Sequence, residues 1–289
     1  MYKTFIFIVS IYILLTLCNC QITSREEFLN KIDQYLLEDS SLEYNQIEQQ
    51  IYRDALKRIK NRIIESSSIS FQFDPPSYNQ TVIDSFSSKT LLNPQQNLTF
   101  NPYELQNFNT TLNNSVCGVY YPDENDRSAY YLQNYTSAEE AEASGAFVTH
   151  LHNCGYCSTT KDLAMYMLHF DLTTPIRDCA IVSFVSDEIS LDCIQHSAGL
   201  TYNCAVIWLY DALNTRKYCL DICLYDWVMH VPNNVPKNST ILNPCIQCDE
   251  DKSGPIFKLI AGRTRRDSGL LSAINRPPDS IYNITHYYY

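Results

Sequence analysis

Ten cysteines between residues 117 and 248 constrain the fold of this chain more than any other feature of its sequence. The 289 residues include twelve cysteines, and two of these, Cys18 and Cys20, belong to the leader described below. An even number of cysteines in an oxidising compartment is typical of a disulfide framework. We therefore predict up to five disulfides, with the pairing left open, among Cys117, Cys154, Cys157, Cys179, Cys193, Cys204, Cys219, Cys223, Cys245 and Cys248.

The first twenty residues have the composition of a secretory signal peptide. Lys3 supplies the positive charge, residues 5–17 are apolar, and Cys18-Asn19-Cys20 places small residues before the expected cleavage at Gln21. The apolar stretch is too short to cross a bilayer, and no later stretch is long enough. We expect a secreted, extracellular protein without a membrane span.

The charge and glycine content exclude several classes of function. Removing the leader takes away one lysine, so the net charge changes from −11 to −12. A chain this acidic has no electrostatic reason to bind nucleic acid. Its seven glycines all lie at or after Gly118, which disfavours a glycine-rich phosphate loop. We predict a mainly α fold with a few short strands, and no cofactor.

Before the cysteines, the composition divides the chain into two further segments. Residues 21–65 are expected to form an amphipathic helical arm, with a capping box at Ser24 to Glu27 and isoleucines or alanine at every fourth position from Ile47 to Ile63. The arm either docks on the main domain or binds a partner or a second copy. Residues 66–116 are rich in Asn, Ser, Thr, Gln and Pro and are expected to form an extended connector. Residues 117–289 are then the cysteine-rich domain.

Seven N-x-Ser/Thr sequons follow the leader, and four of them lie in the expected connector. Behind a signal peptide, such sequons predict a glycoprotein whose sugars face water. The acceptors are Asn79, Asn97, Asn109, Asn113, Asn134, Asn238 and Asn283.

Helical patterns recur in the cysteine-rich domain. Capping residues and apolar spacing are the signals for these helices. We expect helices after the capping box Ser137 to Glu140, stopping near Gly145; after Ser158 and Thr159; over residues 200–213; and over residues 218–227, whereas residues 178–185 are compatible with a helix or a strand.

Two blocks of this domain resemble a known set of proteins. The blocks are THLHNCGYCSTTKDLAMYM (149–167) and LNPCIQCDEDKSGPIFKLIAGRTRRDSGLLSAINRP (242–277). They are similar to an uncharacterised family of secreted, cysteine-rich proteins from protists, algae and some fungi. The resemblance covers about residues 137–286. It implies an extracellular location and a shared disulfide-bonded domain, but no chemistry.

The pair Cys154 and Cys157 leaves two catalytic alternatives open. A Cys-x-x-Cys motif is found in thiol oxidoreductases, but here Asn153 replaces the usual preceding aromatic residue. The stretch also weakly resembles the papain-like motif at a helix start. In that hypothesis Cys157 is the nucleophile of a hydrolase. The candidate bases are His150, His152, His230 and His286.

Three arrangements of residues are candidate metal sites, and we favour none of them. Only the first competes with disulfides for the cysteines. The two Cys-x-x-Cys pairs, 154/157 and 245/248, could form a tetrahedral zinc site. His150 and His152 would share one side of a strand. Residues 249–260 imitate half of a calcium loop, with Asp249 and Asp251 as oxygen donors, but Ile260 replaces the bidentate glutamate.

The acidic pair in this last stretch has a structural interpretation that we prefer. Asp249 and Glu250 are expected to form ion pairs with arginines of the same loop, namely Arg263, Arg265 or Arg266.

Together these features favour a structural glycoprotein of an extracellular coat, matrix or filament, with possible self-association or a surface partner. A hydrolase using Cys157 with His150 or His152 and a glycan- or protein-binding module are the alternatives, so the sequence leaves open whether the chain is an enzyme.

Overall fold

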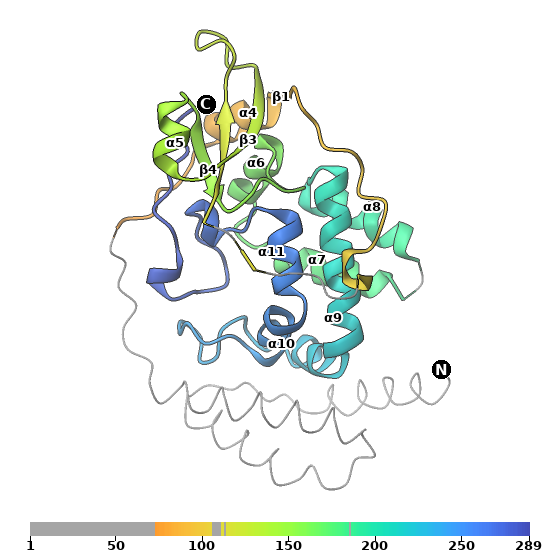
Figure 1. Cartoon of the computed structure of the whole chain (residues 1–289). Coiled ribbons are helices and arrows are strands. Elements are labelled where there is room, and N and C mark those ends of the chain that lie inside the picture. The colour runs from red at the N-terminus through yellow and green to blue at the C-terminus, as the bar shows by residue number, and fades with distance from the viewer. Residues whose placement is uncertain (1–72, 106–110, 113, 185) are drawn as a thin grey trace, which may run out of the picture. The chain divides into compact units, whose positions relative to one another are not determined.

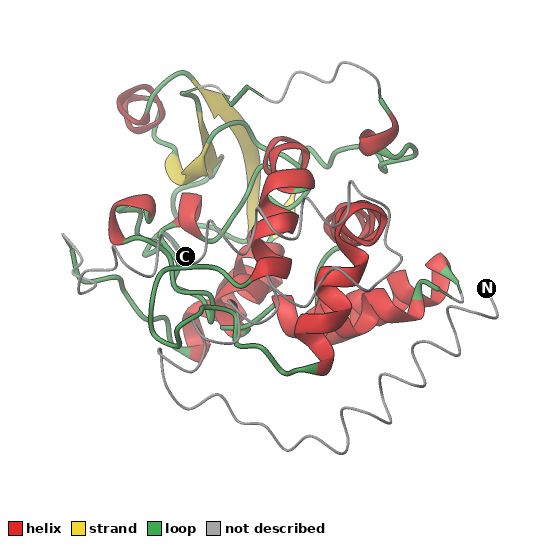
Figure 2. Ribbon diagram, turned by 90° about the horizontal axis from the view of Figure 1, so that it is seen from below, coloured by secondary structure: helices red, strands yellow, loops and turns green. Residues whose placement is uncertain are grey.

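The computed structural model describes residues 73–105, 111–112, 114–184 and 186–289 (Figure 1). The expected signal peptide, the arm at 21–65 and the sequons at Asn109 and Asn113 lie outside these residues. The described chain is mainly helical with one small sheet, as predicted (Figure 2). Within it, no helix combines the length and the apolar character needed to traverse a bilayer.

The chain forms two compact units, and each is described by itself. One comprises Ser70–Tyr218 and Glu250–Tyr289, and the other, where the structure describes it, Cys219–Asp249. The division falls inside helices α9 (Tyr202–Val228) and α10 (Pro244–Lys252).

The larger unit contains a four-stranded sheet in the order β1-β3-β2-β4. Strands β2 (Val116–Tyr120) and β3 (Ala129–Tyr135) form an antiparallel hairpin, and β4 (Phe147–Leu151) pairs antiparallel with the other side of β2. Strand β1 (Thr90–Leu91) is a short parallel addition to β3. Valine and tyrosine, which suit a pleated half-buried surface, make up much of this sheet.

Local capping signals place the helices of this unit. Ser137, Thr159 and Ser186 each accept a hydrogen bond from the backbone N–H three residues later, which satisfies an orphan donor of the first turn. Gly145 and Gly199 have positive φ values of 75° and 67° where helices end. The helices are α4 (Gln80–Ser88), α5 (Ala138–Ala143), α6 (Thr160–Leu168), α7 (Thr173–Val182), α8 (Asp187–Ala198) and α11 (Gly254–Ala261), with short 3₁₀ turns η1 (Pro102–Glu104), η2 (Arg266–Ser268) and η3 (Pro278–Ser280).

The expectation of an extended connector at 66–116 needs correction. Helix α4 lies inside this segment and packs against α6. Its residues Val82, Ile83 and Phe86 lie on one face and are at most 5% exposed in the main core. Asn79 caps the helix with its side-chain oxygen. Three apolar residues at helical spacing are therefore enough to bring a mostly polar segment into the core.

Two helices expected at 200–213 and 218–227 form the single helix α9, of 27 residues. The polar residues between them do not end the helix, because the side chains of Asn214 and Thr215 bind Ser253, which lies between α10 and α11. Asn214 Nδ2 and Thr215 Oγ1 lie 3.0 and 2.7 Å from Ser253 Oγ. The ambiguous stretch at 178–185 is largely helical, as the second half of α7.

The described part of the smaller unit is built on two helical segments joined by two disulfides. Cys219 bonds to Cys248 and Cys223 to Cys245, so the segments run antiparallel. The buried carboxylate of Asp226 accepts the N–H of Cys245 at 2.9 Å and secures the first turn of α10. The larger unit contains the other three disulfides, Cys117–Cys154, Cys157–Cys204 and Cys179–Cys193.

All ten cysteines predicted to be oxidised are thus paired. We expect a thiol count on the denatured but unreduced secreted protein to find no free thiol. Replacing both Cys157 and Cys204 with alanine should lower the free energy of unfolding by about 2 to 5 kcal/mol, measured by denaturant titration. Two or more free thiols per chain would contradict the pairing.

Candidate functional site

Arg263 is the largest fully buried side chain among the described residues, and polar groups surround its guanidinium. Its Nε donates to the carbonyl of Cys157 at 3.0 Å. Nη1 donates to the carbonyl of Thr149 and to Ser268 Oγ, at 3.1 and 2.9 Å. Nη2 donates to Thr149 Oγ1 and to the carbonyl of Ser158, at 2.6 and 3.1 Å. All five N–H groups of the guanidinium are therefore satisfied, all by neutral oxygens.

Two glycines permit the backbone approach that places Arg263 there. The N–H groups of Tyr156 and Cys157 donate to the carbonyls of Ile260 and Ala261, at 3.0 and 2.8 Å. A Cβ on Gly155 would lie 2.4 Å from the Ile260 oxygen. A Cβ on Gly262, whose φ is +74°, would lie 2.4 Å from the Gly155 nitrogen. Only glycine fits at both positions.

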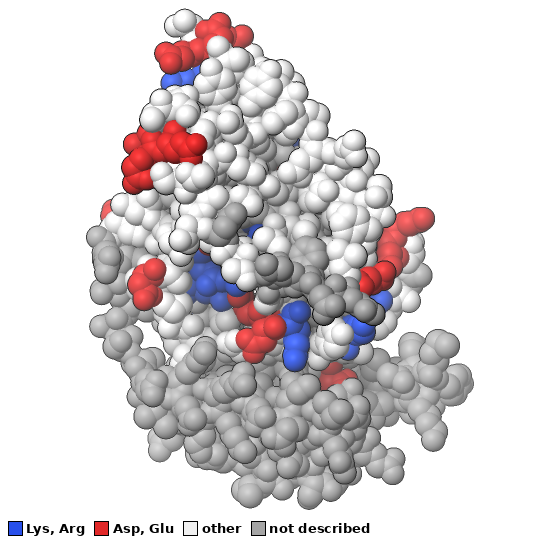
Figure 3. All heavy atoms as spheres, in the orientation of Figure 1, with Lys and Arg blue, Asp and Glu red and all other residues white. Residues whose placement is uncertain are grey.

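The expected ion pairs are only partly present. Glu250 accepts from Lys258 and Arg266, at 3.1 and 3.3 Å, and also from Arg276, which the sequence analysis did not include. Burial alone would raise the pKa of Glu250, but the three cations lower it to about 2. Figure 3 shows a small group of basic side chains near α10 and α11, whereas acidic side chains gather over the β2–β3 turn and α5.

Arg263 and Arg265 do not join Glu250, and the expectation that they would needs correction. Arg263 points into the interior, where burial lowers its pKa and the nearby Tyr288, Tyr166 and Asp162 counteract this. Arg265 donates to the carbonyl of Leu271 at 2.7 Å, and its guanidinium lies 5.7 Å from the centre of the Tyr166 ring.

His150 and Ser158 form a pair that the sequence analysis missed. His150 Nδ1 lies 2.7 Å from the carbonyl of Leu151, which can only accept, so Nδ1 carries the proton. Burial and the charge of Arg263 hold the pKa of His150 well below its ordinary value, so the ring is neutral. Its Nε2 therefore accepts the hydroxyl proton of Ser158, at 2.7 Å. Ser158 Oγ in turn accepts the N–H of Gly155 at 2.7 Å.

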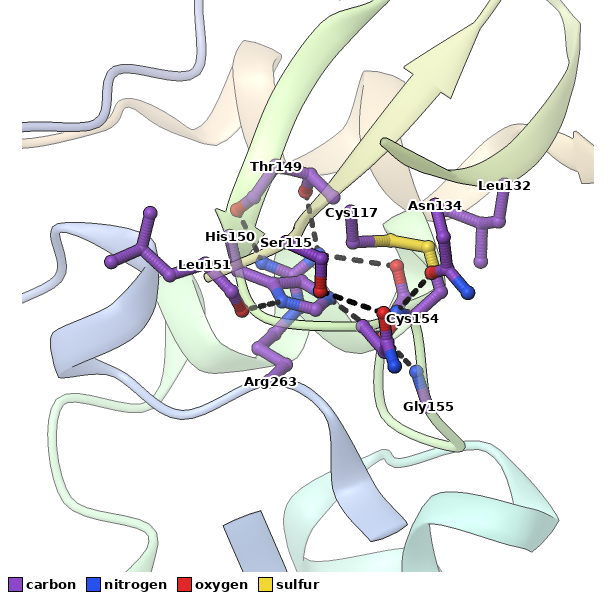
Figure 4. Close-up of a disulfide and its surroundings, with 12 residues drawn as sticks. Ser115, Cys117, Leu132, Asn134, Thr149, His150, Leu151, Cys154, Gly155 and Arg263 are labelled. Atoms are coloured by element: carbon purple, nitrogen blue, oxygen red, sulfur yellow. Dashed lines mark hydrogen bonds between the residues drawn. A yellow bond between two sulfur atoms is a disulfide. The ribbon is translucent and has the colours of Figure 1, made fainter. Parts of the chain in front are cut away.

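This pair has the connectivity of a nucleophile and its base, yet both side chains have 0% exposure. In Figure 4, His150, Arg263 and the Cys117–Cys154 disulfide lie within one closely packed region at the end of β4. The hydrogen bonds of His150 and Ser158 join β4 to the start of α6. The arrangement is suited to fixing the backbone.

The candidate nucleophile Cys157 is fully buried in its disulfide with Cys204. The hydrolase hypothesis requires a free thiolate there, so this state of the protein does not fit it. Cys154 bonds to Cys117, and the Cys-x-x-Cys motif is therefore not a redox pair either. The zinc hypothesis fails for the same reason, because its four cysteines belong to four different disulfides.

The other metal hypotheses also do not fit. His152 lies beyond the end of β4 with a φ of 66°, so it does not continue the strand alternation from His150. Most residues of the candidate calcium loop, 249–260, belong instead to helices α10 and α11. Pro255 lies in the first turn of α11. Among residues 73–289 as described, no group of three or more His, Cys, Asp or Glu side chains could hold a metal ion.

The C-terminal segment contributes two further buried groups that its tyrosine-rich composition did not reveal. His286 is fully buried, with Nε2 lying 2.8 Å from the carbonyl of Ser268 and Nδ1 lying 3.1 Å from the Tyr288 hydroxyl. Tyr288 is 3% exposed and stacks on Phe147. Tyr287 and Tyr289 are 60% and 43% exposed. The segment therefore alternates like a strand, with one side in the core.

The sequons that the structure describes are all at the surface. Their five acceptor side chains are exposed: Asn79, Asn97, Asn134, Asn238 and Asn283.

A family of unknown function (DUF8771) matches residues 187–284 of the chain. This match is consistent with the resemblance to an uncharacterised family, and it covers the region from α8 to the C-terminal segment. Neither the curated proteins nor the solved structures include a match to this chain.

Replacing Arg263 with alanine should abolish secretion or lower the free energy of unfolding by about 4 kcal/mol or more. The change leaves buried carbonyl groups without donors, and each such group costs about 1 to 3 kcal/mol. Arg263→Lys should be nearly as severe, because an ammonium group has three donors and a different geometry. Arg265→Ala is the matched control and should cost much less. Denaturant titration of the three variants would decide, and equal effects at 263 and 265 would contradict the assignment.

The buried histidines should make the fold sensitive to acid. Burial, together with the charge of Arg263, lowers the pKa of His286 from 6.5 to about 3. Below pH 6.5 the histidine binds a proton in the unfolded chain but not in the folded chain. The stabilisation by the neutral ring is therefore fully present above pH 6.5 and decreases as the pH falls towards 3. Over this pH range, protonation linked to His286 lowers the free energy of unfolding by about 5 kcal/mol.

Unfolding should be measured between pH 7 and pH 5, above the range in which Glu250 titrates. His286→Gln, whose amide can still donate to Ser268, should reduce the pH dependence by about 1 kcal/mol per pH unit averaged over this range. An unchanged slope in His286→Gln would contradict the buried neutral state.

Proposed function

We propose that this chain is a secreted, disulfide-stabilised N-glycoprotein with a structural or assembly role in an extracellular coat, matrix or filament. Its five disulfides fit an extracellular protein. One observation carries the proposal: the reactive side chains of the block at 149–167 lie in the interior and take part in its structure. Cys157 is in a disulfide, and His150 and Ser158 are fully buried and bonded to each other.

The surface supports the same proposal. All five described sequon asparagines are exposed, so each could carry a glycan without disturbing the core. Dense disulfides and glycans suppress local opening, and a protein that must persist outside a cell gains resistance to proteolysis from them. The helices expected within 21–65 would each be too short to be stable alone in water, so their apolar stripe would need to be covered by the parent domain or by a neighbouring molecule.

A structural role predicts self-association of the full secreted chain. Light scattering over a range of concentrations should show a species larger than the monomer, and removing residues 21–65 should change its size. A chain that is monomeric both with and without these residues would count against assembly. The matched control is the substitution of the lysines and arginines of the arm with glutamine, which leaves the apolar residues of the stripe unchanged.

The same preparation tests the enzymatic alternative. Intact, unreduced protein should show no labelling of Cys157 by a thiol-directed inhibitor. Labelling that abolishes a hydrolytic activity would transfer the assignment to the cysteine hydrolase.

A binding module is the second candidate, because the C-terminal segment presents exposed aromatic rings. Tyr282, Tyr287 and Tyr289 are 43%, 60% and 43% exposed, whereas Tyr288 between them anchors the segment in the core. Tyrosine provides a large contact area at low entropic cost and suits the recognition of sugars or proteins. The test is the binding of a matrix polysaccharide to the wild type and to the double variant Tyr287→Ser, Tyr289→Ser. Weaker binding by the double variant, with unchanged stability, would support this candidate.

A further inference from the structure

We propose that Asn134 carries an N-glycan that covers the outer edge of β3 and the Cys117–Cys154 disulfide. This glycan presupposes the secretion proposed above. It goes beyond that proposal by giving one sugar chain a defined position and a protective task.

The outer edge of β3 is only partly covered by β1, which pairs with it at Ala129 and Tyr130. The Tyr130 carbonyl accepts the N–H of Leu92 at 2.8 Å, so the backbone groups of every second residue from Tyr130 face this edge. The next such positions are Leu132, Asn134 and Thr136.

Side chains close the positions on either side of Asn134. The amide of Asn93 pairs with Leu132 in both directions, with Nδ2 donating to its carbonyl at 2.8 Å and Oδ1 accepting its N–H at 3.0 Å. Thr136 donates its backbone N–H to Glu140 Oε2 at 2.6 Å. Asn93 and Glu140 thus act as substitutes for a neighbouring strand. The position between them is the sequon residue.

The side chain of Asn134 is arranged for modification. Its Oδ1 accepts the N–H of Cys154 at 2.7 Å, which leaves Nδ2 for the sugar (Figure 4). The residue is exposed, and it lies directly opposite Cys117 in the β2–β3 register. In the modification, Nδ2 loses one proton and forms a bond to C1 of the sugar. The bond from C1 to the diphosphate of a lipid-linked oligosaccharide donor breaks, and the diphosphate lipid leaves.

A glycan at this point lies over the accessible half of the disulfide. Cys117 is fully buried, whereas Cys154 is partly exposed and hydrogen-bonded through its backbone to the glycosylated side chain. A strand edge without a neighbour is a template for pairing with another chain. A bulky, hydrated sugar on that edge prevents such pairing and hinders a reducing thiol from approaching Cys154.

The test compares secreted full-length variants. Thr136→Ala removes the sequon but keeps the hydrogen bond from Cys154 to Asn134, and Asn134→Asp removes the acceptor nitrogen but keeps an oxygen for Cys154. Thr136→Ser is the matched control, because it keeps both the sequon and a hydroxyl for Glu140. Thr240→Ala removes the exposed sequon at Asn238 and controls for the loss of any one glycan.

Peptide mass spectrometry should find Asn134 glycosylated in the wild type and in Thr136→Ser. Timed reduction with dithiothreitol, followed by alkylation, should show the Cys117–Cys154 disulfide opening at least threefold faster in Thr136→Ala and Asn134→Asp. Light scattering should show more oligomer in the same two variants. Thr136→Ser and Thr240→Ala should match the wild type in both measurements.

An unmodified Asn134 in the secreted wild type would overturn the inference, and so would equal reduction rates in all variants. Glycans at Asn79, Asn97, Asn238 or Asn283 with none at Asn134 would refute only this inference. A secreted chain without any glycan would refute the proposed glycoprotein itself.

Discussion

The buried guanidinium of Arg263 is the interaction on which the larger unit depends. It contacts the edge strand β4 through Thr149, the start of α6 through Cys157 and Ser158, and the turn η2 through Ser268. Transferring a cation into a protein interior is costly unless each donor is satisfied. Here five oxygens from three elements meet that requirement, so the elements cannot shift independently of one another. The polar groups of residues 149–158 are in this way used for hydrogen bonds inside the protein.

The same charge explains the state of the two histidines beside it. His150 and His286 are fully buried, and the field of Arg263 adds to burial in disfavouring their protonated forms. Each ring then has one donor and one acceptor nitrogen, and the carbonyls of Leu151 and Ser268 determine which is which. Each neutral imidazole can therefore donate one hydrogen bond and accept another, and so connect two parts of the backbone or side chains in a defined orientation. This use of histidine is structural, and it needs no access to solvent.

The sequence predicted what depends on local signals or on counting. The caps at Ser137 and Thr159, the helix stop at Gly145 and the oxidation of ten cysteines all follow from such signals. It did not predict what depends on tertiary approach. Neighbouring cysteines 154 and 157 bond to different partners because β2 reaches one and α9 the other. Arg263 lies close in sequence to Glu250, but burial among carbonyls decided its partners. The buried Ser158 gave no signal beyond its role as a possible cap.

The hydrogen bonds that Arg263 makes with residues distant in the sequence have a consequence for how such a chain can be divided. The family match at residues 187–284 includes Arg263 and Cys204 but not Thr149, Cys157 or Ser158. A fragment limited to the matched residues would retain the cation and lose four of the five oxygens that accept its N–H groups. It would also carry Cys193 and Cys204 without Cys179 and Cys157, their disulfide partners. The smallest piece of this protein that can be transplanted, expressed or exchanged with its interior intact therefore begins upstream of β4, well before the boundary that sequence similarity suggests.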